Sequence, residues 1–152
     1  MSKARMERFL DDLANGHDRC AQRHPDFLPN VIEPKYVQAL ADRLRLIWSD
    51  PDSRSRQWRL FAIRALYANF IEPKRDFTVI PAASPFDDAM VYLDRHHEQF
   101  RYCKNPECHT PYYIAQTRKP TKYCSSICAG PAKREAKLRW WHNRPEAKHG
   151  KK

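Results

Sequence analysis

Glycine is scarce in this chain, which has three glycines and twelve prolines among its 152 residues. Neither a Walker A motif nor a G-x-G-x-x-G motif is present, which argues against glycine-rich loops that cradle nucleotide phosphates. No run of about 18 apolar residues occurs, so we expect no membrane span. The charged N-terminus lacks the apolar core of a secretory signal, and the five cysteines are an odd number. Both features argue against a secreted disulfide scaffold, so we expect a cytoplasmic protein.

The positive charge is confined to the last third of the chain. The formal net charge is +10, yet residues 1–100 hold 15 Lys or Arg and 15 Asp or Glu. Residues 101–152 hold 13 Lys or Arg, three acids and four of the five cysteines. This change in composition predicts a helical domain of unknown role at 1–100, a cysteine module at 101–145 and a basic tail at 146–152.

The first 100 residues predict a helical bundle, because apolar residues recur there at helical spacing. The first predicted helix carries an apolar stripe from Met6 to Leu13, and three more helices are predicted at about 35–49, 53–71 and 85–100. The helix at 53–71 is apolar on most sides, with Trp58 and Phe61 on one face, so we expect it to lie at the centre. Before the last helix, Phe77–Ile80 is a short β-prone run.

Few residues in this segment carry chemistry. His17, Cys20 and His24 fall at i, i+3 and i+7 and could share a helical face, but three ligands are a weak signal for a metal site. The alternative is a partly buried cysteine flanked by surface histidines. Asp11 and Asp12 are adjacent and do not face each other on a helix, so we expect surface roles for them. No nucleophile has a base nearby in sequence, and we predict no enzyme.

The strongest signal is the pattern C-x4-C-x15-C-x3-C, formed by Cys103, Cys108, Cys124 and Cys128. Two close pairs, joined by a spacer that closes as a hairpin, can place four thiolates around one tetrahedral ion, and zinc suits that set. Four thiolates leave no open position, so we predict one structural Zn²⁺. Two disulfides or an iron–sulfur cluster are the alternatives, and His109 could replace one ligand.

The residues around the cysteines predict a knuckle, a hairpin and a helix in that order. Asn105-Pro106 favours a tight turn within the first pair. Pro111–Ala115 is β-prone, residues 116–121 form a polar tip, and Lys122-Tyr123 returns to the second pair. A basic helix follows at about 131–144, with Pro131 in its first turn. This is the treble-clef order, so the expected fold class is mainly α, with a small α+β zinc module after the helical domain.

These residues resemble a known family. Tyr102-Cys103-Lys-Asn-Pro-Glu-Cys108, the aromatic strand, Tyr123-Cys124-Ser125, Cys128 and Ala132-Lys133-Arg134 are similar to the CGNR-type zinc finger. That finger lies at the C-terminus of bacterial transcriptional regulators. The resemblance covers residues 100–144 and implies that the four cysteines are zinc ligands. Where the family has Cys-Gly-Asn-Arg, this chain reads Cys128-Ala-Gly-Pro, so no role of the family's Asn-Arg transfers.

Basic and aromatic residues line the predicted C-terminal helix. Ala132, Ala136 and Trp140 share a face that we expect to pack on the zinc module. Lys133, Lys137, Trp141 and Arg144 form another stripe, and such rows neutralise phosphates while indoles stack on bases. The residues predicted to contact nucleic acid, with duplex DNA as the expected partner, are Arg118, Lys119, Lys122, Lys133, Arg134, Lys137, Arg139, Trp141 and Arg144.

The sequence therefore predicts a zinc-dependent DNA-binding protein that acts in transcriptional control. Its N-terminal bundle would bind a small ligand, a second copy of the chain or another protein. One alternative is a zinc-stabilised adaptor for protein–protein interaction without nucleic-acid contact, and the basic face could also be merely solvated. A treble-clef nuclease would need a histidine base on the hairpin beside an open metal position, and the hairpin offers only His109.

Overall fold

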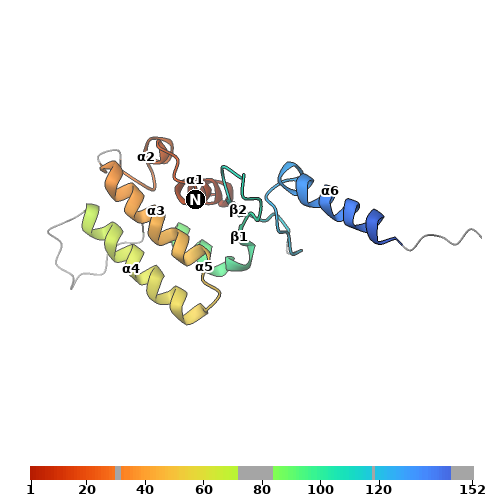
Figure 1. The fold of residues 1–152 in the computed structure, drawn as a ribbon. Helices are drawn as coiled ribbons and strands as arrows, with labels where there is room; N and C mark the ends of the chain where they lie inside the picture. Colours follow the sequence, from red (N-terminus) through yellow and green to blue (C-terminus); the bar gives the residue numbers. More distant parts are fainter. Residues whose placement is uncertain (30–31, 72–83, 118, 145–152) are drawn as a thin grey trace, which may run out of the picture.

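The described residues form six α-helices and one small antiparallel sheet (Figure 1). The computed structural model describes residues 1–29, 32–71, 84–117 and 119–144, and the structural statements below concern these ranges. The elements are α1 Lys3–Ala14, α2 Cys20–Arg23, α3 Pro34–Trp48, α4 Ser53–Ile71, α5 Pro85–Arg95, a 3-10 turn His97–Gln99, β1 Phe100–Tyr102, β2 Tyr112–Ile114 and α6 Ser126–Asn143. The prediction of a mainly α-helical chain is confirmed, while the predictions for 77–80 and 146–152 fall outside the described residues.

Local sequence explains where the helices of the body begin. Pro34 occupies the first turn of α3. Backbone N–H groups in a first turn have no acceptor within the helix, so the lack of an N–H in proline costs nothing there. Ser84 caps α5: its hydroxyl accepts a hydrogen bond from the Asp87 N–H, and the Asp87 carboxylate accepts one from the Ser84 N–H, both at 3.1 Å. This capping box stabilises the start of α5. The helix ends at Arg95, earlier than predicted, because the chain turns there into β1.

The hydrophobic core lies between α1, α3, α4 and α5. The predicted stripe of α1 is confirmed, since Phe9, Leu10 and Leu13 have no exposed surface. Phe9 also stacks on Phe27, with ring centroids 4.3 Å apart. Full burial of one such side chain contributes about 2 kcal/mol to stability, so this cluster is the main source of stability for the helical body.

The position of α4 differs from the prediction of a central helix. Its buried residues, Leu60, Ile63 and Tyr67, lie on one face and contact the core. On the opposite face Trp58 is 70% exposed and Phe61 is 68% exposed. The prediction was wrong because no other described element covers this second apolar face, and α4 therefore lies at the edge of the bundle (Figure 1).

The two-stranded sheet is attached to the helical body through polar and aromatic contacts. The Asn15 side chain pairs with the outer edge of β2: its Nδ2 donates to the Tyr112 carbonyl at 2.8 Å, and its Oδ1 accepts from the Tyr112 N–H at 3.1 Å. The Trp48 indole N–H donates to the Arg101 carbonyl at 2.9 Å. Phe100 of β1 belongs to the core cluster. The sheet and the helical body therefore share one core.

A buried carboxylate–imidazole pair connects α1 to the residues around α2. Nε2 of His24 lies 2.9 Å from Oδ2 of Asp12, and both side chains are buried. The interpretation of His24 and Asp12 as surface residues is therefore wrong, and Cys20 is only 1% exposed. Nε2 of His17 lies 3.5 Å from Oδ1 of Asp12. Within the described ranges these side chains form no group that could hold a metal ion.

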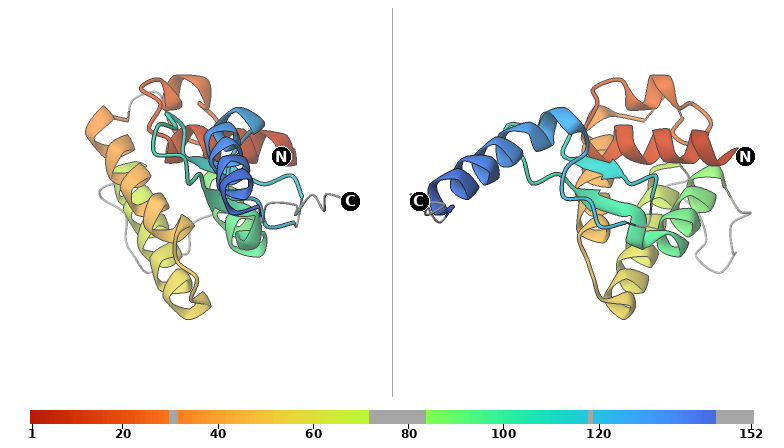
Figure 2. Two further views of the ribbon diagram at one scale, coloured as in Figure 1. Left: turned by 45° about the vertical axis from the view of Figure 1, so that its right-hand side comes forward. Right: turned by 90° about the vertical axis from the view of Figure 1, so that its right-hand side faces the viewer.

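The C-terminal helix α6 extends away from the body (Figures 1 and 2). Every side chain from Lys133 to Asn143 is exposed, and no residue of α6 belongs to the core cluster. None of the described helices, α6 included, is long and apolar enough to cross a membrane. Within the described part of the chain, α6 lies close to the other elements at its first turns, next to the cysteines (Figures 1 and 2).

Candidate metal centre and adjoining basic helix

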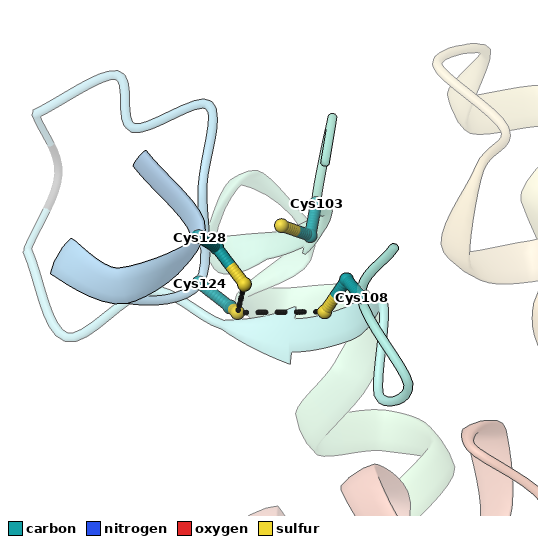
Figure 3. A group of neighbouring side chains, drawn as sticks. All are labelled: Cys103, Cys108, Cys124 and Cys128. Carbon is teal, nitrogen blue, oxygen red and sulfur yellow. Dashed lines mark hydrogen bonds between the residues drawn. The ribbon is translucent and has the colours of Figure 1, made fainter. Parts of the chain in front are cut away.

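Four cysteine side chains meet between the sheet and the start of α6 (Figure 3). Their sulfur atoms all lie within 4.8 Å of one another, from Cys103, Cys108, Cys124 and Cys128. Sγ of Cys124 is 3.7 Å from Sγ of Cys108 and 3.5 Å from Sγ of Cys128, and all are free thiols. A tetrahedral ion with metal–sulfur bonds of about 2.3 Å requires sulfurs about 3.8 Å apart. The four cysteines could therefore hold a metal ion.

The first pair of cysteines is held by a tight turn. The Asn105 carbonyl accepts a hydrogen bond from the Cys108 N–H at 3.1 Å, and the Asn105 side chain accepts one from the Glu107 N–H at 3.0 Å. The turn brings Cys108 back towards Cys103, which is fully buried. His109, the alternative ligand, is exposed and lies outside the group of thiols.

The second pair is positioned by the first turn of α6. Ser125 is the N-cap residue, and its hydroxyl accepts a hydrogen bond from the Cys128 N–H at 3.2 Å. The predicted helix start near residue 131 is wrong: α6 begins at Ser126, and Pro131 lies inside the helix. The signal that identifies the true start is the serine directly after Cys124, because serine is a preferred N-cap residue.

The strand after the turn pairs with the strand before it. In this antiparallel pair, Phe100 lies opposite Ile114. The sequence predicts a spacer that closes on itself through Lys122-Tyr123, but these two residues form no strand. The Lys104 N–H donates instead to the Lys122 carbonyl at 2.9 Å, which brings the returning chain to the turn. The pairing with β1 is favoured because Phe100 is buried in the core and Ile114 packs against it.

The loop between β2 and α6 is held by two side chains of the sheet. Nη1 of Arg101 donates to the Lys119 carbonyl at 3.0 Å, and the Tyr113 hydroxyl donates to the Thr121 carbonyl at 2.9 Å. Lys119 and Lys122, both predicted to contact nucleic acid, are exposed on this loop. The predicted contact Arg118 lies outside the described residues.

Hydrogen bonds within the cluster make the acidities of the thiols unequal. Donation from the Cys124 thiol and contact with the Ser125 side chain lower the pKa of Cys128 to about 7. Burial, together with hydrogen bonds to the neighbouring thiols, raises the pKa of Cys124 to about 12, and burial also raises the pKa of Cys108. A metal ion would displace these protons, so its affinity should fall in acid.

Aromatic side chains are exposed near the end of α6. The prediction that Ala132, Ala136 and Trp140 pack on the zinc module is wrong, because Ala136 is exposed and Trp140 is 56% exposed. The Trp140 ring instead contacts the Trp141 ring edge-on, with centroids 4.9 Å apart. The Arg144 guanidinium lies over both rings, 5.2 Å from the first centroid and 5.6 Å from the second.

Four basic side chains of α6 are exposed and make no hydrogen bond or ion pair within the described part of the chain: those of Lys133, Arg134, Lys137 and Arg139. At 3.6 residues per turn, the first three share one side of the helix with Trp140 and Trp141. Arg139 and the acidic residue Glu135 lie on the opposite side. We call Lys133, Arg134, Lys137, Trp140, Trp141 and Arg144 the basic-aromatic face. Sequence reasoning assigned Trp140 to packing and so missed its place on this face.

Comparisons with protein-family models, with curated proteins and with solved structures gave no match to this chain. The resemblance to the CGNR-type finger therefore rests on the sequence motifs alone. The candidate metal site rests on the positions of its four cysteines.

Proposed function

We propose that the four clustered cysteines hold one structural Zn²⁺ ion. The observation that carries this proposal is the approach of all four thiols to within 4.8 Å of one another. Four sulfur ligands around a single centre suit zinc, which is tetrahedral, binds thiolates and makes no redox demand. Four thiolates would leave no position for water, so the ion would link the sheet to α6 and would not catalyse hydrolysis.

The zinc proposal is tested by elemental analysis of the purified, reduced protein. We expect one zinc per chain, and we expect Cys124→Ser to lose the metal while the helical body remains folded. Cys20→Ser is the matched control, since Cys20 lies in the core and outside the group of four thiols. Zinc well below one ion per chain would contradict the proposal, and bound iron with visible absorption would assign an iron–sulfur cluster instead.

We further propose that the basic-aromatic face of α6 binds nucleic acid, with duplex DNA as the partner. The supporting observation is that Lys133, Arg134 and Lys137 project into solvent on one side of a helix with no ion-pair partner among the described residues. Such cations bind phosphates and release counterions, and the major groove of DNA is wide enough to admit an α-helix. The two exposed indoles add surfaces for stacking.

This proposal gives the chain a role in transcriptional control, in line with the resemblance of residues 100–144 to the CGNR-type finger. In that role zinc would fix the first turn of α6, and the remainder of the helix would project towards DNA. The proposal assigns no catalytic residue: the four cysteines would complete the shell of the metal and give it a structural role.

The nucleic-acid proposal is tested by measuring duplex DNA affinity at several salt concentrations. We expect the logarithm of the affinity to fall linearly with the logarithm of salt concentration. The double variant Lys133→Glu with Lys137→Glu should lose at least about tenfold in affinity and reduce the salt slope by about two, without loss of zinc.

Arg139→Glu is the matched control for this measurement, because it reverses a charge on the same helix but on the opposite side. Retained affinity in Arg139→Glu would support a single binding face. An equal loss in both variants would show that only the total charge matters. Absence of DNA binding at low salt would refute the proposal and favour the adaptor alternative.

A further inference from the structure

The outer face of α4 presents an apolar stripe that nothing in the described chain covers. Trp58 and Phe61 are 70% and 68% exposed, and Ala65 follows them on the same side, one turn further along the helix. The core-facing residues of α4 lie on the opposite side. Apolar surface exposed in this way usually marks a binding surface. We call Arg54, Trp58, Phe61, Ala65 and Asn69 the α4 stripe.

The charges beside the α4 stripe are already neutralised within the chain. Arg64 Nε lies 2.6 Å from Asp87, and Arg59 Nε lies 2.8 Å from Asp50. Gln57 is also engaged, because its side-chain amide donates to an aspartate of α5 at 2.7 Å. Among the described residues of α4, Arg54 is the one cation without a partner, so the helix offers little free positive charge to a polyanion or an acidic peptide. The face therefore suits an apolar, electrically neutral partner.

The spacing of large and small residues along the α4 stripe is self-complementary. If two copies of α4 lie antiparallel and cross between Phe61 and Ala62, Trp58 of one copy lies opposite Ala65 of the other. In the same register Arg54 lies opposite Asn69, so no like charges meet within the stripe, and the flanking Arg59 and Arg64 are each paired with an aspartate of their own copy. Trp58 would thus fit beside the small Ala65, and the Phe61 rings of the two copies would pack against each other at the crossing point.

We propose that the chain forms a two-fold symmetric homodimer by antiparallel pairing of α4 with α4 of a second copy. A two-fold interface uses the same surface on both copies, and the α4 stripe meets that condition when the two helices cross between Phe61 and Ala62. The helix has 19 residues and is about 28 Å long, so the contact would run along one side of the helical body. The proposal does not depend on α6 binding nucleic acid.

The test is sedimentation equilibrium of the full, zinc-loaded chain between about 1 µM and 1 mM, a range that resolves a weak to moderate dimer. We expect a reversible monomer–dimer equilibrium. Trp58→Ala should raise the dimer dissociation constant at least about tenfold, because a central aromatic side chain typically dominates an interface. Val91→Ala removes an exposed apolar side chain of α5 and should leave the constant unchanged.

A swap of the large and small residues tests the register itself. Ala65→Trp alone should weaken the dimer, because two indoles would then compete for one space. The double variant Trp58→Ala with Ala65→Trp should restore the dimer, because each introduced tryptophan would lie opposite an introduced alanine of the other copy. Circular dichroism checks that each variant is folded. A chain that stays monomeric throughout, a dimer that Trp58→Ala does not weaken, or a swap that restores nothing would each overturn the proposal.

Discussion

Asn15 offers a direct test of how the sheet is attached to the helical body. The Asn15 side chain makes two hydrogen bonds to the backbone of Tyr112, at 2.8 and 3.1 Å, across 97 positions of sequence. Replacing Asn15 by Ala would leave a partly buried N–H and C=O without partners, and each such loss costs about 1 to 1.5 kcal/mol. Alanine favours helix by a few tenths of a kcal/mol, which offsets a little of that loss.

We therefore expect Asn15→Ala to lower the free energy of unfolding by about 2 kcal/mol, and the midpoint of thermal unfolding by about 5 °C. The measurement is urea unfolding followed by circular dichroism, with the slope on urea concentration unchanged. Asn143→Ala is the matched control, because the Asn143 side chain is exposed and makes no hydrogen bond within the described residues. It should change stability by less than about 0.5 kcal/mol.

Asn15→Asp separates hydrogen bonding from packing. Aspartate has the same shape, but its carboxylate cannot donate to the Tyr112 carbonyl and lies close to Asp11. We expect this variant to be at least as unstable as Asn15→Ala at neutral pH. An Asn15→Asp variant as stable as the unaltered chain would show that the two hydrogen bonds do not hold the sheet.

Three further predictions follow from buried groups. A zinc chelator should make four thiols reactive towards a disulfide reagent. Cys20 should react only when the protein unfolds, because it is buried and burial raises its pKa to about 12. Reaction of all five thiols at once would contradict this prediction. Burial and the neighbouring Asp12 raise the pKa of Asp11 to about 6, so the folded state loses stability as pH rises from about 4 to 6. Asp11→Asn should remove that loss and stabilise the protein by about 1 to 2 kcal/mol at pH 7, a value kept small because solvent screens this partly exposed group. Urea unfolding at several pH values measures the effect. Trp48→Phe should cost about 1 to 2 kcal/mol, because the Arg101 carbonyl loses its donor, and an unchanged urea midpoint would refute that contact.

The sequence predicts local features of this molecule well. The helices of the body follow from apolar periodicity, and the predicted segments 35–49 and 53–71 match α3 and α4 closely. The approach of four cysteines to one another follows from their paired spacing, because each short loop keeps two thiols together. Such features depend on neighbours within one or two turns of chain, and these are visible in the sequence.

Features that depend on distant contacts could not be predicted in the same way. Local sequence places Asn15 at the end of a helix, and its role towards Tyr112 depends on a contact that no local pattern encodes. The same holds for Trp58 and Trp140, because an aromatic side chain is buried only if another element covers it. The pairing of β2 with β1 is likewise decided by burial of Phe100 in a core that belongs to the helical body.

The exposure of α6 changes the meaning of the charge on this chain. From Lys133 onwards α6 has no side chain buried against the rest of the molecule, so its direction is set at its first turns, by the Ser125 cap and by Cys124 and Cys128. The other two cysteines belong to the turn after β1, and the sheet is attached to α1 and α3 through Asn15 and Trp48. A metal bound by all four thiols would therefore complete a path of contacts that runs from the neutral body, through the sheet, to the start of the basic helix. If α4 also pairs with a second copy, the same path would fix two basic helices relative to each other, and a duplex site recognised by the dimer would have to be two-fold symmetric.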